Sequence, residues 1–148
     1  MISIDKFAMV VENAPLISID LIVEKNGKFL LGKRVNKPAL GYYFTLGGRI
    51  FKNESIAEAI RRITKKELGR EFSSEHTRFF GVFEHFYDDS FVADDISTHY
   101  VVLAYKLYID EELDLPKDEH NEYHYFTRDE LLKEKNVHKY VKDYFKES

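Results

Sequence analysis

Apolar residues dominate two neighbouring runs of the chain, residues 16–24 (LISIDLIVE) and 28–34 (KFLLGKR), and both runs are typical of strands. The dipeptide Asn26-Gly27 lies between them. Both central positions of a two-residue hairpin turn need a positive φ, which Asn and Gly adopt more readily than other residues. The pattern therefore predicts a β-hairpin at this point.

The remaining pattern alternates between strand-like and helical segments. A short helix is expected over residues 3–12, with Ile4, Phe7, Ala8 and Val11 on one side. Further strands are expected from Tyr42 to Leu46, ending at Gly47-Gly48, over residues 79–87 and 98–109, and around Tyr123–Phe126. The sequence TRDE caps a last helical segment from Thr127 onward. This order predicts an α/β/α sandwich with a mixed β-sheet.

A central helix is predicted most clearly of all. Ser55 and Glu58 form a capping box at its start, and Gly69 follows Leu68 as a left-handed C-cap. Ile56, Ile60, Ile63 and Glu67 are spaced as one stripe on this helix. Glu67 thus falls on the face that the isoleucines reserve for the core.

Composition narrows the class of protein. The chain has 148 residues, of which 44% are hydrophobic and 32% charged, and we expect a single domain over residues 1–148. A net charge of -4 argues against a general nucleic-acid binder, since phosphate backbones require a basic surface. The absence of cysteine excludes disulfides and thiol catalysis, and no apolar run reaches the roughly 20 residues of a membrane span. We expect a cytoplasmic protein without a membrane partner.

Glu67 leaves two alternatives open. Its side chain either swings out to solvent from the end of the helix or stays inside, where a buried carboxylate needs a cation. Gly47-Gly48 favours the second alternative, because glycines let the backbone present main-chain carbonyls that a hard cation such as Mg²⁺ accepts as ligands.

Residues 46–69 (LGGRIFKNESIAEAIRRITKKELG) resemble the Nudix box. Gly48, Glu54, Arg62, Glu67 and Gly69 occupy matching positions. Three positions depart from the pattern: Ile63 stands where the box has Glu, Lys66 replaces the first of two paired Glu, and Arg70 replaces an apolar residue. Nudix enzymes use these carboxylates to bind several Mg²⁺ ions and to activate water against phosphorus. The resemblance therefore implies fewer metal ions here.

The chain is similar over almost its whole length to the GDP-mannose mannosyl hydrolase branch of the Nudix superfamily. The similar segments are PLISIDLIVE, FLLGKR, GYYFTLGGR, FFGVFEHFYDD, THYVVL and DEHNEY. This resemblance implies Mg²⁺-dependent hydrolysis of GDP-mannose, or of GDP-glucose, by attack of water at the anomeric carbon. The products would be GDP and the free sugar with inverted configuration.

The same resemblance implies the metal ligands and the general base. The carbonyl of Gly47 and the carboxylates of Glu67 and Glu119 match ligands of Mg²⁺, or of Mn²⁺ in its place. His120 matches the base, since an imidazole can take a proton from water around neutral pH. On composition alone His85, His99, His124 and His138 are equal candidates. His85 also matches a family site position, although a strand histidine can simply point outward.

Residues for the leaving group and the sugar follow from the resemblance too. Arg34, Arg49 and Arg62 match family arginines that neutralise the diphosphate, and Tyr100 matches a tyrosine that donates to it. Asp20 matches an aspartate that stabilises positive charge on the anomeric carbon. The alternatives are an exposed Arg62–Glu58 salt bridge, a core position for Tyr100 and an outward-facing Asp20.

The family is dimeric, so a homodimer is expected, and Phe7 and Lys33 would contact the guanine and the diphosphate or sugar. Two other functions stay open. The first is an ordinary Nudix pyrophosphohydrolase that attacks phosphorus, which the missing Glu at 63 and 66 disfavours. The second is a nucleotide-sugar binding module without turnover, which gives no reason to keep both Glu67 and His120.

Overall fold

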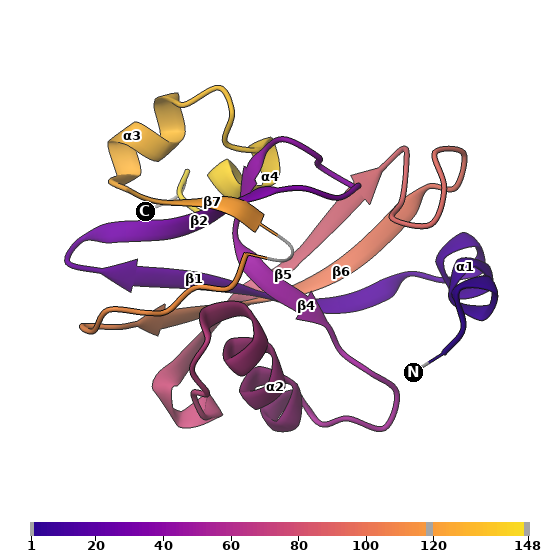
Figure 1. Ribbon diagram of the computed structural model, residues 1–148, viewed down its shortest axis with the longest axis horizontal. Helices are drawn as coiled ribbons and strands as arrows, with labels where there is room; N and C mark the ends of the chain where they lie inside the picture. The colour runs from indigo at the N-terminus through magenta and orange to yellow at the C-terminus, as the bar shows by residue number, and fades with distance from the viewer. Residues whose placement is uncertain (1, 118–119, 147–148) are drawn as a thin grey trace.

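The computed structural model describes residues 2–117 and 120–146, and one seven-stranded sheet forms its centre (Figure 1). The strands are β1 Leu16–Lys25, β2 Lys28–Arg34, β3 Tyr43–Phe44, β4 Leu46–Arg49, β5 Thr77–Tyr87, β6 Thr98–Tyr108 and β7 His120–Phe126. The helices are α1 Ile4–Asn13, α2 Ile56–Leu68, α3 Arg128–Lys133 and α4 Lys139–Asp143, with a single 3₁₀ turn at Ser74–His76. No helix of the described residues is long and apolar enough to cross a membrane.

The predicted hairpin is confirmed. β1 and β2 are antiparallel and meet at Lys25↔Lys28, with Asn26 and Gly27 at φ values of 52° and 76°. Both residues thus supply the left-handed backbone that the turn requires.

The sheet is mixed and divides near its middle. β1 runs parallel to β6, while β2 joins β1 only at Glu24 and Lys25. Beyond that point β4 takes the place of β2 and pairs with β1 from Ser18 to Leu21. A cavity lies where β2 and β4 diverge, lined by Arg34 of β2 and by Gly47, Gly48 and Arg49 of β4.

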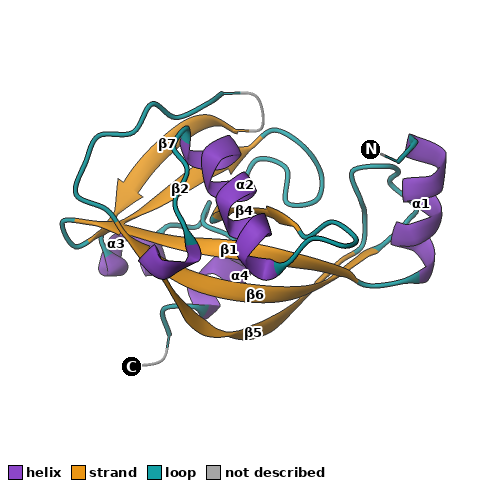
Figure 2. Ribbon diagram, turned by 90° about the horizontal axis from the view of Figure 1, so that it is seen from below, coloured by secondary structure: helices purple, strands orange, loops and turns teal. Residues whose placement is uncertain are grey.

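Helices cover both faces of the sheet, which confirms the predicted α/β/α sandwich. On one face α2 packs Ile60, Ile63 and Leu68 against a core that includes Ile19 and Leu21 of β1. On the other face α3 and α4 pack over a second core, which holds Ile22, Leu31, Ala104, Leu131 and Val141. In Figure 1 α2 lies below the strands and α3 and α4 lie above them, and in Figure 2, seen from below, α2 lies in front of the strands.

The capping signals of α2 are confirmed in full. Ser55 and Glu58 form the reciprocal capping box, and Gly69 adopts a left-handed conformation with φ 75°. Ile60, Ile63 and Glu67 are buried as the stripe predicts, but Ile56 is exposed. Ile56 lies in the first turn of the helix, beyond the edge of the core.

Three boundaries differ from prediction. The expected strand Tyr42–Leu46 is two short strands, and the second, β4, continues through Gly47 and Gly48 to Arg49. β7 begins at His120, earlier than the strand expected around Tyr123–Phe126. The last helical segment is divided into α3 and α4. Tyr43 N donates to Asn136 O and Tyr43 O accepts from His138 N, so Val137 bridges to β3 instead of continuing a helix.

Candidate functional site

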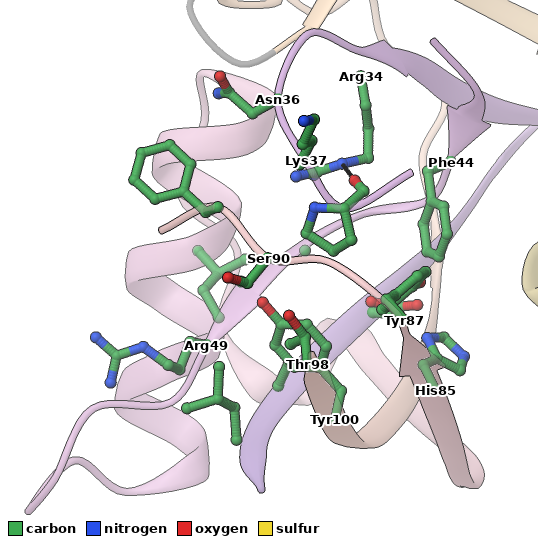
Figure 3. A pocket seen from close by; sticks show the side chains of 18 of the residues that line it. Arg34, Asn36, Lys37, Phe44, Arg49, His85, Tyr87, Ser90, Thr98 and Tyr100 are labelled. Carbon is green, nitrogen blue, oxygen red and sulfur yellow. Dashed lines mark hydrogen bonds between the residues drawn. The ribbon is translucent and has the colours of Figure 1, made fainter. Parts of the chain in front are cut away.

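A cavity of about 430 Å³ lies where the sheet divides, with walls from α1, α2 and several strands. It contains nearly all of the residues predicted to form the site. These are Phe7, Asp20, Arg34, Gly47, Arg49, Arg62, Glu67, His85, Tyr100 and His120. In Figure 3, Phe44, Tyr87 and His85 gather on one wall, whereas Arg49 lies apart from them.

Asp20 is buried and faces the cavity, so the outward-facing alternative is wrong. One carboxylate oxygen, Oδ2, accepts hydrogen bonds from Thr45 Oγ1 at 2.9 Å and from Tyr144 OH at 2.5 Å. Burial raises the pKa of Asp20 to about 6, against the opposing effects of these two hydroxyls and of the Arg34 charge. The result is a buried carboxylate that is ionised at neutral pH.

His85 lies beside Asp20 on the same wall. Its side chain is buried, so it does not point outward, and it stacks on Tyr140 with ring centroids 4.3 Å apart. Burial lowers the pKa of His85 to about 4, and the neighbouring His138 adds to this effect. At neutral pH His85 is therefore an uncharged group in the wall.

His85 and His138 together predict how stability depends on pH. Burial also lowers the pKa of His138 to about 4. The unfolded chain then binds more protons than the folded chain between pH 6.5 and 4. The contribution of the two histidines to the free energy of unfolding is therefore fully present above pH 6.5 and is lost as pH falls toward 4. Asp20 acts in the opposite direction, because its raised pKa of about 6 favours the folded state as pH falls. Two histidines outweigh one aspartate, and we expect a lower urea midpoint at pH 5 than at pH 7.

A His138→Asn variant isolates this effect. His138 is the N-cap of α4, where its Nδ1 accepts a hydrogen bond from Tyr140 N, and asparagine is a good N-cap that does not titrate. The variant should lose less stability than the parent protein between pH 7 and 5. Equal losses in the two proteins would contradict the role given to His138.

Glu67 is buried at the foot of the cavity, and the alternative that it swings out to solvent is wrong. Its Oε1 accepts a hydrogen bond from Gly47 N at 3.3 Å, so the carboxylate lies against the glycine strand. A Cβ on Gly47 would stand 2.1 Å from Ile19 O. Only glycine therefore lets β4 lie this close to β1. In this position the backbone N–H of Gly47 reaches the Glu67 carboxylate.

The residues near Glu67 fit a magnesium ion. Among the described residues, no group of three His, Asp or Glu side chains could hold a metal by itself. Mg²⁺, however, is commonly bound by one or two carboxylates, with waters and substrate phosphates completing its octahedron. A buried carboxylate beside a glycine backbone supplies oxygen ligands of this kind. The third predicted ligand, Glu119, lies outside the described residues.

His120 opens β7 and lies in the cavity wall with its side chain buried. It pairs with Arg34 in the register of β2 and β7. A Cβ on Gly32 would stand 2.7 Å from Cγ of the imidazole and 2.8 Å from Cδ2. The absence of a side chain at Gly32 therefore makes the space that the His120 ring occupies.

A Gly32→Ala variant tests this packing. The added methyl group must displace the His120 ring. Since the family resemblance implies that His120 is the general base, we expect the rate of substrate hydrolysis to fall roughly tenfold or more, because a small misplacement of a catalytic group is costly. The control is Gly27→Asn, because nothing lies near the position of its Cβ and asparagine accepts a positive φ. Full activity of Gly32→Ala would contradict the placement of His120.

Two arginines line the mouth of the cavity around Phe51. The guanidinium carbon of Arg62 lies 3.7 Å from the Phe51 ring centroid, and that of Arg49 lies 5.0 Å from it. The Arg49 guanidinium carbon also lies 4.7 Å from the ring centroid of Phe7 in α1. Arg62 is also held by Glu54, through bonds of 2.7 and 2.9 Å, and by the carbonyl of Arg49. Its salt-bridge partner is therefore Glu54, so the alternative of an exposed Arg62–Glu58 salt bridge is wrong.

Arg34 and Tyr100 complete the polar lining. Arg34 Nε donates to the carbonyl of Pro38 at 2.7 Å, the bond drawn in Figure 3. Tyr100 is half-buried and lines the cavity instead of filling the core. Lys33 does not line this cavity, and its ammonium lies 3.8 Å from Glu122 Oε1.

Sequence reasoning missed Thr45, Phe51 and Tyr144. Thr45 follows a run of aromatic residues. It is two residues from Gly47, so in an extended chain both lie on the same face, which is a weak signal that Thr45 is close to the site. Tyr144 lies 124 residues from Asp20, so no local pattern connects them.

Comparisons with known proteins show the family of this chain. The model of the NUDIX domain family matches residues 15–146. The low-salt glycan biosynthesis protein Agl8 of Haloferax volcanii is 41% identical over 108 residues, which cover 73% of this chain and 68% of that protein. An ADP-ribose pyrophosphatase of Methanocaldococcus jannaschii is 40% identical over 55 residues, or 37% of this chain and 32% of that protein.

A solved structure shares the fold. The MutT NUDIX hydrolase of Burkholderia pseudomallei superposes with a TM-score of 0.72 at 21% identity, covering 90% of this chain and 97% of that one.

Proposed function

The chain belongs to the NUDIX family, and from that premise we propose that it hydrolyses a GDP-hexose, GDP-mannose or GDP-glucose, at the sugar's anomeric carbon. Water would displace GDP and leave the free sugar with inverted configuration. The resemblance to the GDP-mannose mannosyl hydrolase branch supports this substrate class and this point of attack.

The observation that carries the proposal is the loss of carboxylates from the box helix. Ile63, where the box has Glu, is 1% exposed and belongs to the apolar core. Lys66 stands where the box has the first of its two paired Glu, and its side chain also lines the cavity. The helix thus directs a single box carboxylate, that of Glu67, into the site, which disfavours the multi-metal attack on phosphorus.

The second buried carboxylate suits chemistry at carbon. Cleavage of a glycosidic C–O bond builds positive charge on the anomeric carbon and ring oxygen, which a nearby carboxylate stabilises. Asp20 occupies the wall formed by β1 and is ionised at neutral pH. In this proposal it faces the sugar, and neutral His85 beside it donates or accepts a hydrogen bond with a sugar hydroxyl.

The remaining residues act on water and on the leaving group. His120 takes the proton from the attacking water, and Arg34, Arg49 and Tyr100 bind the diphosphate as it departs. Gly47 and Glu67, with Glu119, would hold Mg²⁺, or Mn²⁺ in its place, which neutralises charge on the leaving diphosphate when bound. Arg62 lines the cavity and is held by Glu54 and the carbonyl of Arg49, and in this proposal it acts on the diphosphate with the other two arginines.

Names of relatives support the substrate class to different degrees. Agl8 is named as a glycan biosynthesis protein, and sugar nucleotides are substrates of such chemistry. The ADP-ribose pyrophosphatase is named for cleavage of a pyrophosphate in a nucleotide sugar, and it favours the second candidate, attack at phosphorus. We propose a homodimer as well, as the resemblance implies.

A substrate panel separates these functions. The protein with Mg²⁺ is incubated with GDP-mannose, GDP-glucose and ADP-ribose, and the products are separated by ion-exchange chromatography. GDP and a free hexose, with ADP-ribose left intact, is the expected result. A nucleoside monophosphate with a sugar phosphate would establish the pyrophosphohydrolase, and binding without turnover would establish the binding module.

A further inference from the structure

Tyr144 follows the last turn of α4, in the helical layer opposite α2, yet its hydroxyl reaches the site. The O–H group lies 2.5 Å from Oδ2 of Asp20, and the side chain is only 4% exposed. Tyr144 does not line the cavity itself. It stands behind the carboxylate, outside the cavity lining to which Asp20 belongs.

Two hydroxyl groups converge on the same oxygen of Asp20. Tyr144 and Thr45 both donate to Oδ2, at 2.5 and 2.9 Å. The other oxygen, Oδ1, lies toward β4, 3.0 Å from the point where a Cβ on Gly47 would stand. A carboxylate normally turns easily about its last bond, since that torsion is broad. Two donors to one oxygen remove this freedom.

Tyr144 is itself held in place by its surroundings. Its ring packs edge-on against Phe83, with centroids 4.7 Å apart. The next residue, Phe145, accepts two hydrogen bonds on its carbonyl from Arg128 of α3, at 3.0 and 2.6 Å. His85 Nε2 lies 3.4 Å from the Tyr144 oxygen on the remaining side. The position of the hydroxyl is thus set before any ligand binds.

We propose that Tyr144 is a positioning residue, which with Thr45 fixes the rotation of the Asp20 carboxylate so that Oδ1 faces the substrate. The role rests on the proposed function, in which Asp20 stabilises the cationic sugar. Stabilisation of developing charge depends on groups oriented in advance, so a carboxylate free to rotate gives a slower reaction without weaker substrate binding. The C-terminal helix thereby contributes to catalysis without touching the substrate.

A Tyr144→Phe variant keeps the ring and removes only the hydroxyl. We expect kcat for GDP-mannose to fall roughly ten- to a hundredfold, the value of one hydrogen bond to a charged group, with KM changed less than about twofold. The matched control is Tyr140→Phe in the same helix. The Tyr140 hydroxyl accepts a hydrogen bond from Phe86 N and donates one to Phe86 O, both at 2.9 Å. Because it bonds to backbone and not to Asp20, its loss should leave kcat near that of the parent protein.

A double variant gives a readout that a merely structural role would not produce. If Tyr144 acts through Asp20, then adding Tyr144→Phe to Asp20→Asn should cost little more than Asp20→Asn alone. An unchanged kcat in Tyr144→Phe, or an equal further loss in the double variant, would overturn the proposal. Thr45→Val removes the other donor and must also lower kcat, which keeps the test decisive if Tyr144→Phe does not fold.

The two proposals fail in different ways. GMP and mannose 1-phosphate from the parent protein would contradict the proposed function. If the parent protein gives GDP and mannose, the role of Tyr144 is decided separately, by comparing kcat of the single and double variants.

Discussion

Glu67→Gln is expected to lower turnover of GDP-mannose roughly a thousandfold, because it removes the single carboxylate that the box helix places in the cavity. The folded protein should change little. Glutamine has nearly the same shape as glutamate and keeps an oxygen to accept the 3.3 Å hydrogen bond from Gly47 N. The change also removes a buried charge, so we expect the melting temperature to shift by no more than about 3 °C.

The measurement combines steady-state kinetics over a range of Mg²⁺ concentrations with thermal melting. Glu71→Gln is the control, because this glutamate follows the same helix and is exposed. It should keep full activity and the same dependence on Mg²⁺. A Glu67→Gln protein that is folded and fully active would remove the metal role assigned to this residue.

The second large loss of activity is expected for His120→Asn. Removal of a general base costs about a hundred- to ten-thousandfold in rate, and we expect kcat to fall within that range while KM stays nearly constant. Asparagine is smaller than histidine and leaves space beside Gly32, so the fold should be retained.

The control for His120 lies four residues along the same strand. His124 is exposed and packs its ring on Phe126, at a centroid distance of 4.4 Å, away from the cavity. His124→Asn should therefore retain its activity. Comparable losses in both variants would show that the strand is sensitive to substitution and would contradict the role of His120 as base.

Local signals account for the parts of the fold that the sequence predicted. Asn26-Gly27, the Ser55–Glu58 capping box and Gly69 each satisfy a backbone requirement within a few residues, so their effect is visible in a short window. The division of the last segment into α3 and α4 depends on backbone bonds to Tyr43, far away in the chain. The pairing of β4 with β1 through the glycines is likewise a long-range contact.

The site shows the same contrast. The burial of Glu67 follows from the stripe it shares with Ile60 and Ile63, although spacing alone left an exposed position open. The alternative partner for Arg62, Glu58, came from the helical i,i+4 rule, whereas in the fold a loop brings Glu54 to the guanidinium. Tyr144 could not be found at all, because only the folded chain places α4 behind Asp20.

The most direct test of the central claim is hydrolysis of GDP-mannose in ¹⁸O-labelled water with Mg²⁺, followed by mass spectrometry of the products. The account predicts ¹⁸O in free mannose and none in GDP, because water attacks the anomeric carbon. Label on a phosphate, in GMP or in mannose 1-phosphate, would contradict it.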